Sequence, residues 1–223
     1  MKWLRNFAAN DKHNNVSYKF RAKRFELFNN LLIINNVEKT DILDVGGTNY
    51  FWDNWKKFLN PNASITIVNI AKTAIVGYRG ILGDANNLSF IKDKTVDILL
   101  SNSLIEHLGE FENQKIFADE VQRISKYHFI QTPAFLFPLE PHFLFPLFHW
   151  FPKLVRIFLH QNVNLGWYNK EGNYKIAKKH VEEIRILRKR DLKKMFPKSK
   201  IIVEKFIFMP KSYIVTNMLN SKI

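Results

Sequence analysis

Short runs of apolar residues alternate along the chain with segments whose apolar positions recur at helical spacing. Residues 17–35 predict an amphipathic helix that carries Arg21, Lys23 and Arg24 on its solvent side. Strands that are apolar on both faces and alternate with helices predict a parallel sheet covered on both sides. Two closing strands in succession predict an antiparallel hairpin at one edge of this sheet. Further helices are predicted over residues 51–59, 112–125 and 189–196, and strands over residues 42–45, 65–70, 77–82, 95–100, 127–131, 201–208 and 212–216.

The predicted strand over residues 42–45 and the loop after it organise the rest of the chain. Gly46 and Gly47 can adopt backbone angles closed to other residues, so a ligand can lie against the main chain there. Asp44, at the carboxyl end of the strand, can accept hydrogen bonds from that ligand or hold the loop. Open α/β sheets bind ligands at this edge, although an ordinary turn would also explain two adjacent glycines.

Two common nucleotide-binding motifs are absent from this loop. No third glycine completes a G-x-G-x-x-G fingerprint, and no Gly-Lys-Ser/Thr of a phosphate loop follows. Hydride transfer and NTP hydrolysis are therefore disfavoured, and a nicotinamide dehydrogenase remains only a distant alternative on topology.

The composition is that of a folded protein with one substantial domain. The chain has 223 residues, of which 46% are hydrophobic and 24% charged. The absence of cysteine excludes disulfides and thiolate metal sites, and no metal site is predicted. The first residues lack the apolar run of a secretory signal, so a cytoplasmic protein is expected.

The formal net charge of +14 predicts attraction to a polyanion or to an anionic membrane surface. A solvated basic surface is the alternative interpretation of the same charge. No zinc finger, RNP motif or other nucleic-acid module is visible, so nucleic acid is not the expected partner. An RNA methyltransferase or RNA-binding protein is suggested by the charge alone.

Residues 133–160 are unusually rich in phenylalanine and proline. A membrane span needs about 20 largely apolar residues in unbroken helix, and four prolines divide this segment. We interpret residues 133–185 as an insertion after the fifth strand that forms a lid over an acceptor pocket. Its aromatic side chains either line a hydrophobic cleft, dip into a membrane interface or pack on the domain's own core.

The order of the motifs resembles that of class I S-adenosylmethionine-dependent methyltransferases, in the type 11 group. The motifs are ILDVGGT at residues 42–48, TIVN at 66–69, GDA at 83–85 and VDILLSNSLIEHL at 96–108. Thr132-Pro133, followed by FPLEPHF at residues 137–143, resembles a later part of one bacterial branch of that group. The resemblance covers residues 17–216, nearly the whole chain.

The resemblance implies a Rossmann-like, doubly wound α/β fold with a seven-stranded, mostly parallel sheet and an antiparallel last strand, forming a single domain over residues 1–223. It implies S-adenosylmethionine as the cofactor. The glycine loop would hold the amino-acid end, the end of the second strand the ribose, the GDA segment the adenine, and the end of the fourth strand the methionine portion. The implied cofactor-binding residues are Asp44, Gly46, Gly47, Thr48, Asn69, Ile70, Asp84, Ala85, Ser101, Asn102 and Ser103.

Two positions depart from the family's pattern. Asn69 stands where an acidic residue usually ends the second strand, and a neutral hydrogen bond is generally weaker than a charge-assisted one. Thr48 stands where a glycine usually lets the ligand approach. These departures favour the alternative of a non-catalytic binding or scaffolding protein with a weakened cofactor site.

Methyl transfer depends mainly on aligning nucleophile, methyl group and sulfur. A hydroxyl acceptor also needs a general base, which suits histidine. His107, His142 and Glu106 are the candidate catalytic residues, with Glu140 as a further alternative. Glu106-His107 could instead form a polar turn that orders the cofactor loop, and His142 could be a surface or interface histidine. The expected acceptor is a small molecule, a glycan or a lipid-linked intermediate. We also expect that the protein can contact the inner face of the membrane peripherally.

Overall fold

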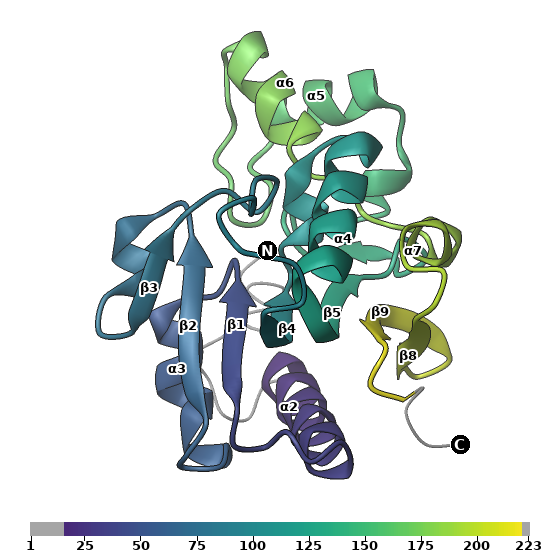
Figure 1. Ribbon diagram of the computed structural model, residues 1–223. Coiled ribbons are helices and arrows are strands. Elements are labelled where there is room, and N and C mark those ends of the chain that lie inside the picture. Colours follow the sequence, from purple (N-terminus) through teal and green to yellow (C-terminus); the bar gives the residue numbers. More distant parts are fainter. Residues whose placement is uncertain (1–15, 220–223) are drawn as a thin grey trace.

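One seven-stranded sheet forms the centre of the computed structural model, which describes residues 16–219 (Figure 1). The strands follow the order β3-β2-β1-β4-β5-β9-β8. Neighbours from β3 to β5 run parallel, whereas β9 runs antiparallel to both β5 and β8. This topology confirms the predicted α/β fold with a mostly parallel sheet and an antiparallel last strand. The strands are β1 Asp41–Val45, β2 Ser64–Asn69, β3 Arg79–Leu82, β4 Val96–Asn102, β5 Ser125–Pro133, β8 Lys200–Phe206 and β9 Met209–Thr216.

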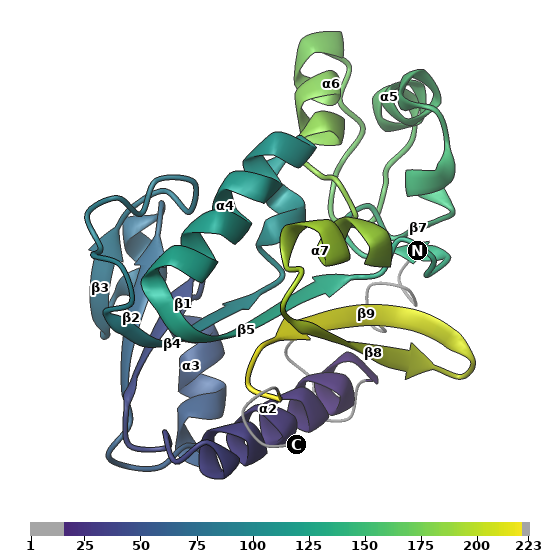
Figure 2. The same cartoon turned by 45° about the vertical axis from the view of Figure 1, so that its right-hand side comes forward.

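Helices cover both faces of the sheet, because successive strand residues point to opposite sides. Ile42 packs with α2 and α3 on one face, and its neighbour Leu43 packs with α4 and α7 on the other. Figure 2 shows α2 below the sheet and α4 and α7 above it. The helices are α2 Val16–Ile34, α3 Asn49–Trp55, α4 Phe111–Ile124, α5 Lys153–Asn162, α6 Tyr174–Glu182 and α7 Lys189–Met195, with 3-10 turns η1 Lys56–Phe58, η2 Lys72–Ile75, η3 Ile105–Leu108 and η4 Phe148–Trp150.

The sequence predictions agree with these elements to within a few residues at most ends. The helix predicted over residues 51–59 is shorter, because α3 ends at Trp55 and η1 follows it. In the closing hairpin, β9 lies inside the sheet beside β5, and only β8 forms the edge. The prediction that Arg24 faces solvent is wrong: the residue is 8% exposed, because its guanidinium pairs with Glu204 at 2.7 Å.

Residues 133–185 form a layer above the carboxyl ends of the strands (Figure 1). We call this segment the lid; it contains α5, α6 and a small antiparallel pair, β6 Leu139–Glu140 and β7 Phe145–Pro146. Phe143 and Phe148 pack with residues of α5 and α6 in a hydrophobic cluster separate from the two sheet faces. Within the described residues, no helix is both long enough and apolar enough to cross a membrane.

Candidate functional site

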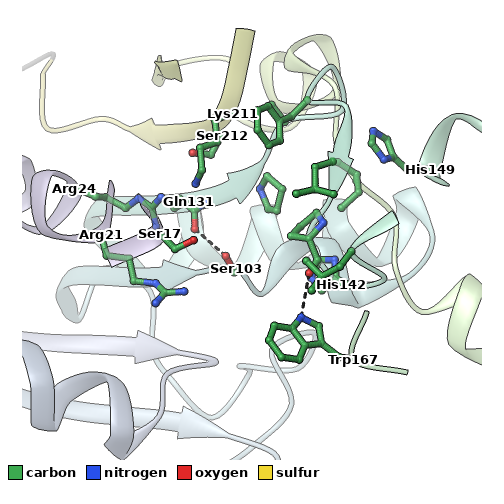
Figure 3. A pocket seen from close by; sticks show the side chains of 17 residues that line it. Ser17, Arg21, Arg24, Ser103, Gln131, His142, His149, Trp167, Lys211 and Ser212 are labelled. Atoms are coloured by element: carbon green, nitrogen blue, oxygen red, sulfur yellow. Dashed lines mark hydrogen bonds between the residues drawn. The ribbon is translucent and has the colours of Figure 1, made fainter. Parts of the chain in front are cut away.

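Two cavities meet at the carboxyl ends of β1 and β4, where the strand order reverses direction. The first, the glycine-loop cavity, has a volume of about 290 Å³ and is lined by Asp44, Gly46, Gly47, Thr48, Asn102 and Ser103 together with residues of α2 and α3. The second, the lid cavity, also has a volume of about 290 Å³ and lies between α2, the end of β5 and the lid (Figure 3). Arg21 and Ser103 line both cavities, which are therefore neighbours. Reversal points of this kind are the usual ligand sites of open α/β sheets.

The two glycines are required by the loop itself. Gly46 has a φ of 81°, which favours glycine, and its N–H donates to the Val68 carbonyl at 2.8 Å. A Cβ on Gly46 would lie 2.8 Å from the Leu104 side chain, and one on Gly47 would lie 1.9 Å from an Asp44 carboxylate oxygen. A larger residue at either position would therefore clash with the protein's own side chains and disturb the loop, whether or not a ligand is bound.

Asp44 lies beneath this loop, and only 1% of its surface is exposed. The indole N–H of Trp52 donates to Oδ2 at 2.7 Å, whereas Oδ1 finds no partner within residues 16–219. Burial raises the pKa of Asp44 to about 7, although the Trp52 hydrogen bond opposes the increase. Asp44 thus borders the glycine-loop cavity and holds a buried acceptor oxygen that no group of the described residues uses.

The two residues that depart from the family pattern both hold the loop in shape. Thr48 is the N-cap of α3, and its hydroxyl accepts a hydrogen bond from the Phe51 N–H at 3.2 Å. The Asn69 amide donates to the Gly47 carbonyl at 2.8 Å, and its oxygen accepts from the Ala71 N–H at 2.9 Å. Both functional groups of the Asn69 amide are thus already engaged within the chain.

The structure does not bring all predicted cofactor residues to the cavities. Asn69 and Ile70 lie at the end of β2, and Asp84 and Ala85 follow β3, so the four form a neighbouring edge outside both cavities. Ile70 is 77% exposed and Asp84 is exposed, whereas Ala85 is buried. Ser101 is fully buried within β4, and its hydroxyl has no partner in the described part of the chain.

Two residues at the end of β4 form hydrogen bonds to side chains beside the lid cavity. Asn102 accepts from Arg24 at 2.7 Å, which fixes α2 against the strand. Ser103 has a φ of 56°, and its hydroxyl donates to the Gln131 side chain at 2.9 Å (Figure 3). Sequence reasoning missed Gln131, although its place at the end of the fifth predicted strand was a usable signal.

Glu106 and His107 of η3 lie beside His142 of the lid, so the structure brings three of the predicted catalytic candidates together. The buried Glu106 carboxylate accepts from Thr132 at 2.9 Å, and its other oxygen, Oε1, lies 4.0 Å from Nε2 of His142. The Glu140 carboxylate lies 2.6 Å from Nδ1 of His142, and the His107 and His142 rings stand edge to face at 4.5 Å. Of these residues, His142 lines the lid cavity.

Charge and burial shift the pKa values of this cluster in opposite directions. Burial raises the pKa of Glu106, although the positive charge of His142 opposes the increase. Burial favours the neutral form of His142, but the Glu140 hydrogen bond and the charges of Glu140 and Glu106 together raise its pKa. Desolvation and the charge of His142 lower the pKa of His107 to about 4, so His107 is neutral near pH 7.

The lid cavity is also lined by three cationic residues that were not predicted as site residues, Arg21, Arg24 and Lys211. Burial lowers the pKa of Lys211 to about 8, with a contribution from Arg24, and its ammonium lies 4.4 Å from the centre of the Phe20 ring. Burial and the charge of Arg24 lower the pKa of Arg21 to about 10. Figure 3 shows Arg21 and Arg24 on the opposite side of the cavity from His142 and Trp167.

No protein-family model matches the sequence, and no curated protein is similar to it in sequence. In structure, the chain is similar to magnesium protoporphyrin IX methyltransferase from Synechocystis with SAH bound, at 10% identity and a TM-score of 0.55 over 96% of this chain and 91% of that one. It is also similar to an S-adenosylmethionine-dependent methyltransferase from Clostridium acetobutylicum, at 12% identity and a TM-score of 0.54 over 87% and 90% of the two chains. A third similar structure is that of a protein described by the conversion of a disulfide bond into a thioacetal group during echinomycin biosynthesis. It is 11% identical to this chain, with a TM-score of 0.52 over 85% of this chain and 79% of that one.

Identities this low show a shared fold and leave the type 11 group unconfirmed. The chain has the Rossmann-like α/β fold found in S-adenosylmethionine-dependent methyltransferases.

Proposed function

We propose that this protein is an S-adenosylmethionine-dependent methyltransferase that acts on a hydroxyl-bearing acceptor. The observation that carries the proposal is the junction of the two cavities at Ser103, beside the glycine loop. A methyl donor in one cavity and an acceptor in the other would meet there, and alignment is the main requirement of methyl transfer.

The residues of the glycine-loop cavity fit the amino-acid end of this cofactor. The free Oδ1 of Asp44 suits an ammonium group, and Gly46 and Gly47 line the same cavity. At about 290 Å³ the cavity lies at the lower limit of ligand pockets, roughly 300–1,000 Å³, so it would hold only part of the molecule. The nucleoside would lie along the neighbouring edge with Asn69, Ile70, Asp84 and Ala85. When bound, the cofactor would supply a methyl group activated by a positively charged sulfur.

The lid cavity fits an acceptor, and His142 at its wall, with Glu106 and His107 behind it, would act on the acceptor's proton. Trp167 and Phe137 give the cavity an apolar side, while Arg21 and Lys211 supply positive charge. An amphipathic or anionic acceptor, such as a glycan or a lipid-linked intermediate, suits this lining. We do not expect nucleic acid.

The outer side of the lid supports peripheral contact with a membrane surface. Leu154 and Phe158 of α5 are 70% and 63% exposed, and Trp150 beside them is 44% exposed. Lys153, at the start of the same helix, could meet anionic headgroups. A lipid-linked acceptor would then reach the lid cavity from the membrane.

Isothermal titration with S-adenosylmethionine, S-adenosylhomocysteine and NAD tests the proposed cofactor. We expect the two sulfur ligands to bind and NAD not to bind. Asp44→Asn should weaken the binding of S-adenosylmethionine roughly 10- to 100-fold, the usual loss when a hydrogen bond to a charged group is removed. Asp53→Asn is the matched control, because Asp53 is exposed on α3 and lies outside both cavities. A folded protein that binds neither sulfur ligand would favour the scaffolding alternative.

A further inference from the structure

A cluster that reaches the lid cavity through His142 brings together three groups that commonly bind metal ions. One ligand atom each from Glu106, His107 and His142 lies within 4.8 Å of the other two. Two of the residues come from η3 and the third from the lid between β6 and β7, so folding assembles the cluster. We propose that Glu106, His107 and His142 form a binding site for one divalent transition-metal ion.

The donor set selects the class of ion. Two imidazole nitrogens and one carboxylate oxygen suit Zn²⁺, Co²⁺ or Fe²⁺, whereas Ca²⁺ and Mg²⁺ prefer sites made of oxygen. Zinc–ligand distances of about 2.1 Å in a tetrahedral site place the donor atoms about 3.4 Å apart. Nε2 of His142 and Oε1 of Glu106 are 4.0 Å apart. A closure of about 0.6 Å between these atoms, within reach of small side-chain rotations, would complete that edge of the site.

Supporting hydrogen bonds already orient two of the three ligands. Glu140 lies 2.6 Å from Nδ1 of His142 and leaves Nε2 directed towards Glu106, the carboxylate–histidine arrangement that commonly supports a metal-bound imidazole. The Thr132 hydroxyl occupies Oε2 of Glu106, while Oε1 is buried and has no hydrogen-bond partner among the described residues. Both ligands thus present their unoccupied donor atom to the same point.

A direct ion pair between His142 and Glu106 explains this geometry less well. Charge-assisted hydrogen bonds between nitrogen and oxygen are about 2.7–2.9 Å long, and the 4.0 Å separation leaves a gap between the two groups. An ion in that gap would satisfy the buried oxygen of Glu106. It would also engage the nearby ring of His107.

The place of the site suggests what a metal ion would do. Three protein ligands with one open position are typical of catalytic metal sites, and His142 lies on the wall of the lid cavity. A hydroxyl bound at the open position would have a lowered pKa and would release its proton to solvent water, with the two histidines acting as ligands. This consequence rests on the proposed methyltransferase function, whereas the metal site itself does not.

Metal binding can be measured directly on the full chain after removal of any affinity tag and treatment with a chelator. Titration with Zn²⁺ by calorimetry and with Co²⁺ by visible absorption should each show one ion per chain. Glu106→Gln and His107→Ala should each weaken binding at least 10-fold. Glu140→Gln should weaken it roughly 10- to 100-fold, the usual effect of losing such a supporting carboxylate. His180→Ala is the control, because His180 belongs to a separate pair with His160 in the lid and should leave binding unchanged.

Several results would overturn the proposal. The first is a folded wild type that binds neither Zn²⁺ nor Co²⁺, and the second is a preference for Mg²⁺ over Zn²⁺. The third is wild-type affinity for Zn²⁺ in both the Glu106→Gln and the His107→Ala variant, and the fourth is a loss of Zn²⁺ binding in His180→Ala alone. Thermal unfolding of each variant shows whether it is folded at the temperature of the titration. S-adenosylmethionine binding, measured on the same samples, separates the two proposals. Retained cofactor binding without metal binding would remove the metal site and leave the methyltransferase proposal standing.

Discussion

Replacing Asp44 with asparagine should change stability and ligand binding in opposite directions. The carboxyl group is buried beneath the glycine loop, and its pKa is raised from 3.8 to about 7. An aspartate that prefers to be neutral in the folded protein makes folding less favourable as pH rises, because the folded state binds more protons than the unfolded state. Asparagine keeps the size of the side chain and an oxygen to accept the Trp52 hydrogen bond, but it does not ionise.

The magnitude follows from the two pKa values. One pKa unit corresponds to about 1.4 kcal/mol, so the difference between 3.8 and about 7 costs the wild type about 4 kcal/mol of stability once both states are ionised. About 2.5 kcal/mol of that cost should develop between pH 5 and pH 8. The wild type should therefore lose about this much stability relative to Asp44→Asn over the interval. Binding of S-adenosylmethionine should meanwhile weaken, because the variant lacks the carboxylate.

Urea denaturation of both proteins at several pH values from 5 to 8 measures this difference, since effects of other titrating groups cancel between them. Asp97→Asn is a control that should show no pH-dependent difference from the wild type between pH 5 and pH 8. The pKa of Asp97 is lowered from 3.8 by hydrogen bonds from Lys126 and Thr40, so its contribution to stability is fully present above that value and is lost only as pH falls below it. The assignment of a raised pKa to Asp44 would be refuted if the free energies of unfolding of wild type and Asp44→Asn changed in parallel with pH. It would also be refuted if the wild type became more stable relative to the variant as pH rises.

Two further substitutions test the supports of the site. Thr48→Ala should cost about 1 kcal/mol of stability in urea denaturation, because it removes the hydroxyl that accepts from the Phe51 N–H. Thr48→Ser keeps a hydroxyl and should retain most of the wild-type stability. Equal losses of stability in the two variants would contradict the capping role. Arg24→Met should cost about 3 kcal/mol, because it leaves the carboxylate of Glu204 buried without its cation. Lys23→Met on the exposed side of the same helix should change stability by less than about 0.5 kcal/mol, and a similar loss in both variants would argue against the pair.

The order of strands and helices was accessible from the sequence because each element carries its own pattern. Ile42 and Leu43 serve opposite faces of one strand, so a continuous apolar run between helices indicates a sheet covered on both sides. The glycine loop was accessible for a similar reason, since two glycines after a buried strand are a local signal. The direction of the last strand followed from the short connection between the strands predicted over residues 201–208 and 212–216, which suits the antiparallel hairpin that β8 and β9 form.

The contacts that complete the site depend on residues far apart in the chain, and no local pattern records them. Arg24 looks like a solvent-facing helix residue in sequence, but it is buried because Glu204 and Asn102 approach it from β8 and β4. Lys211 follows the closing turn, yet it reaches the lid cavity because β9 lies beside β5. The helices of the lid escaped prediction because the prolines and aromatic residues before α5 obscured the helical spacing.

Thr48 and Asn69, the two residues that depart from the pattern of the methyltransferases that the sequence resembles, have a common physical explanation. Thr48 caps α3, and Asn69 ties the second strand to Gly47, so each replaces a possible ligand contact with a contact inside the loop. Such bonds hold the loop in shape before any ligand arrives, which reduces the ordering cost of binding. A weaker hold on the ribose is therefore compatible with a working site, provided that Asp44 and the glycine backbone hold the other end of the cofactor. The departures alone do not favour a scaffold over an enzyme, because the same side chains that give up direct contacts also preorganise the loop.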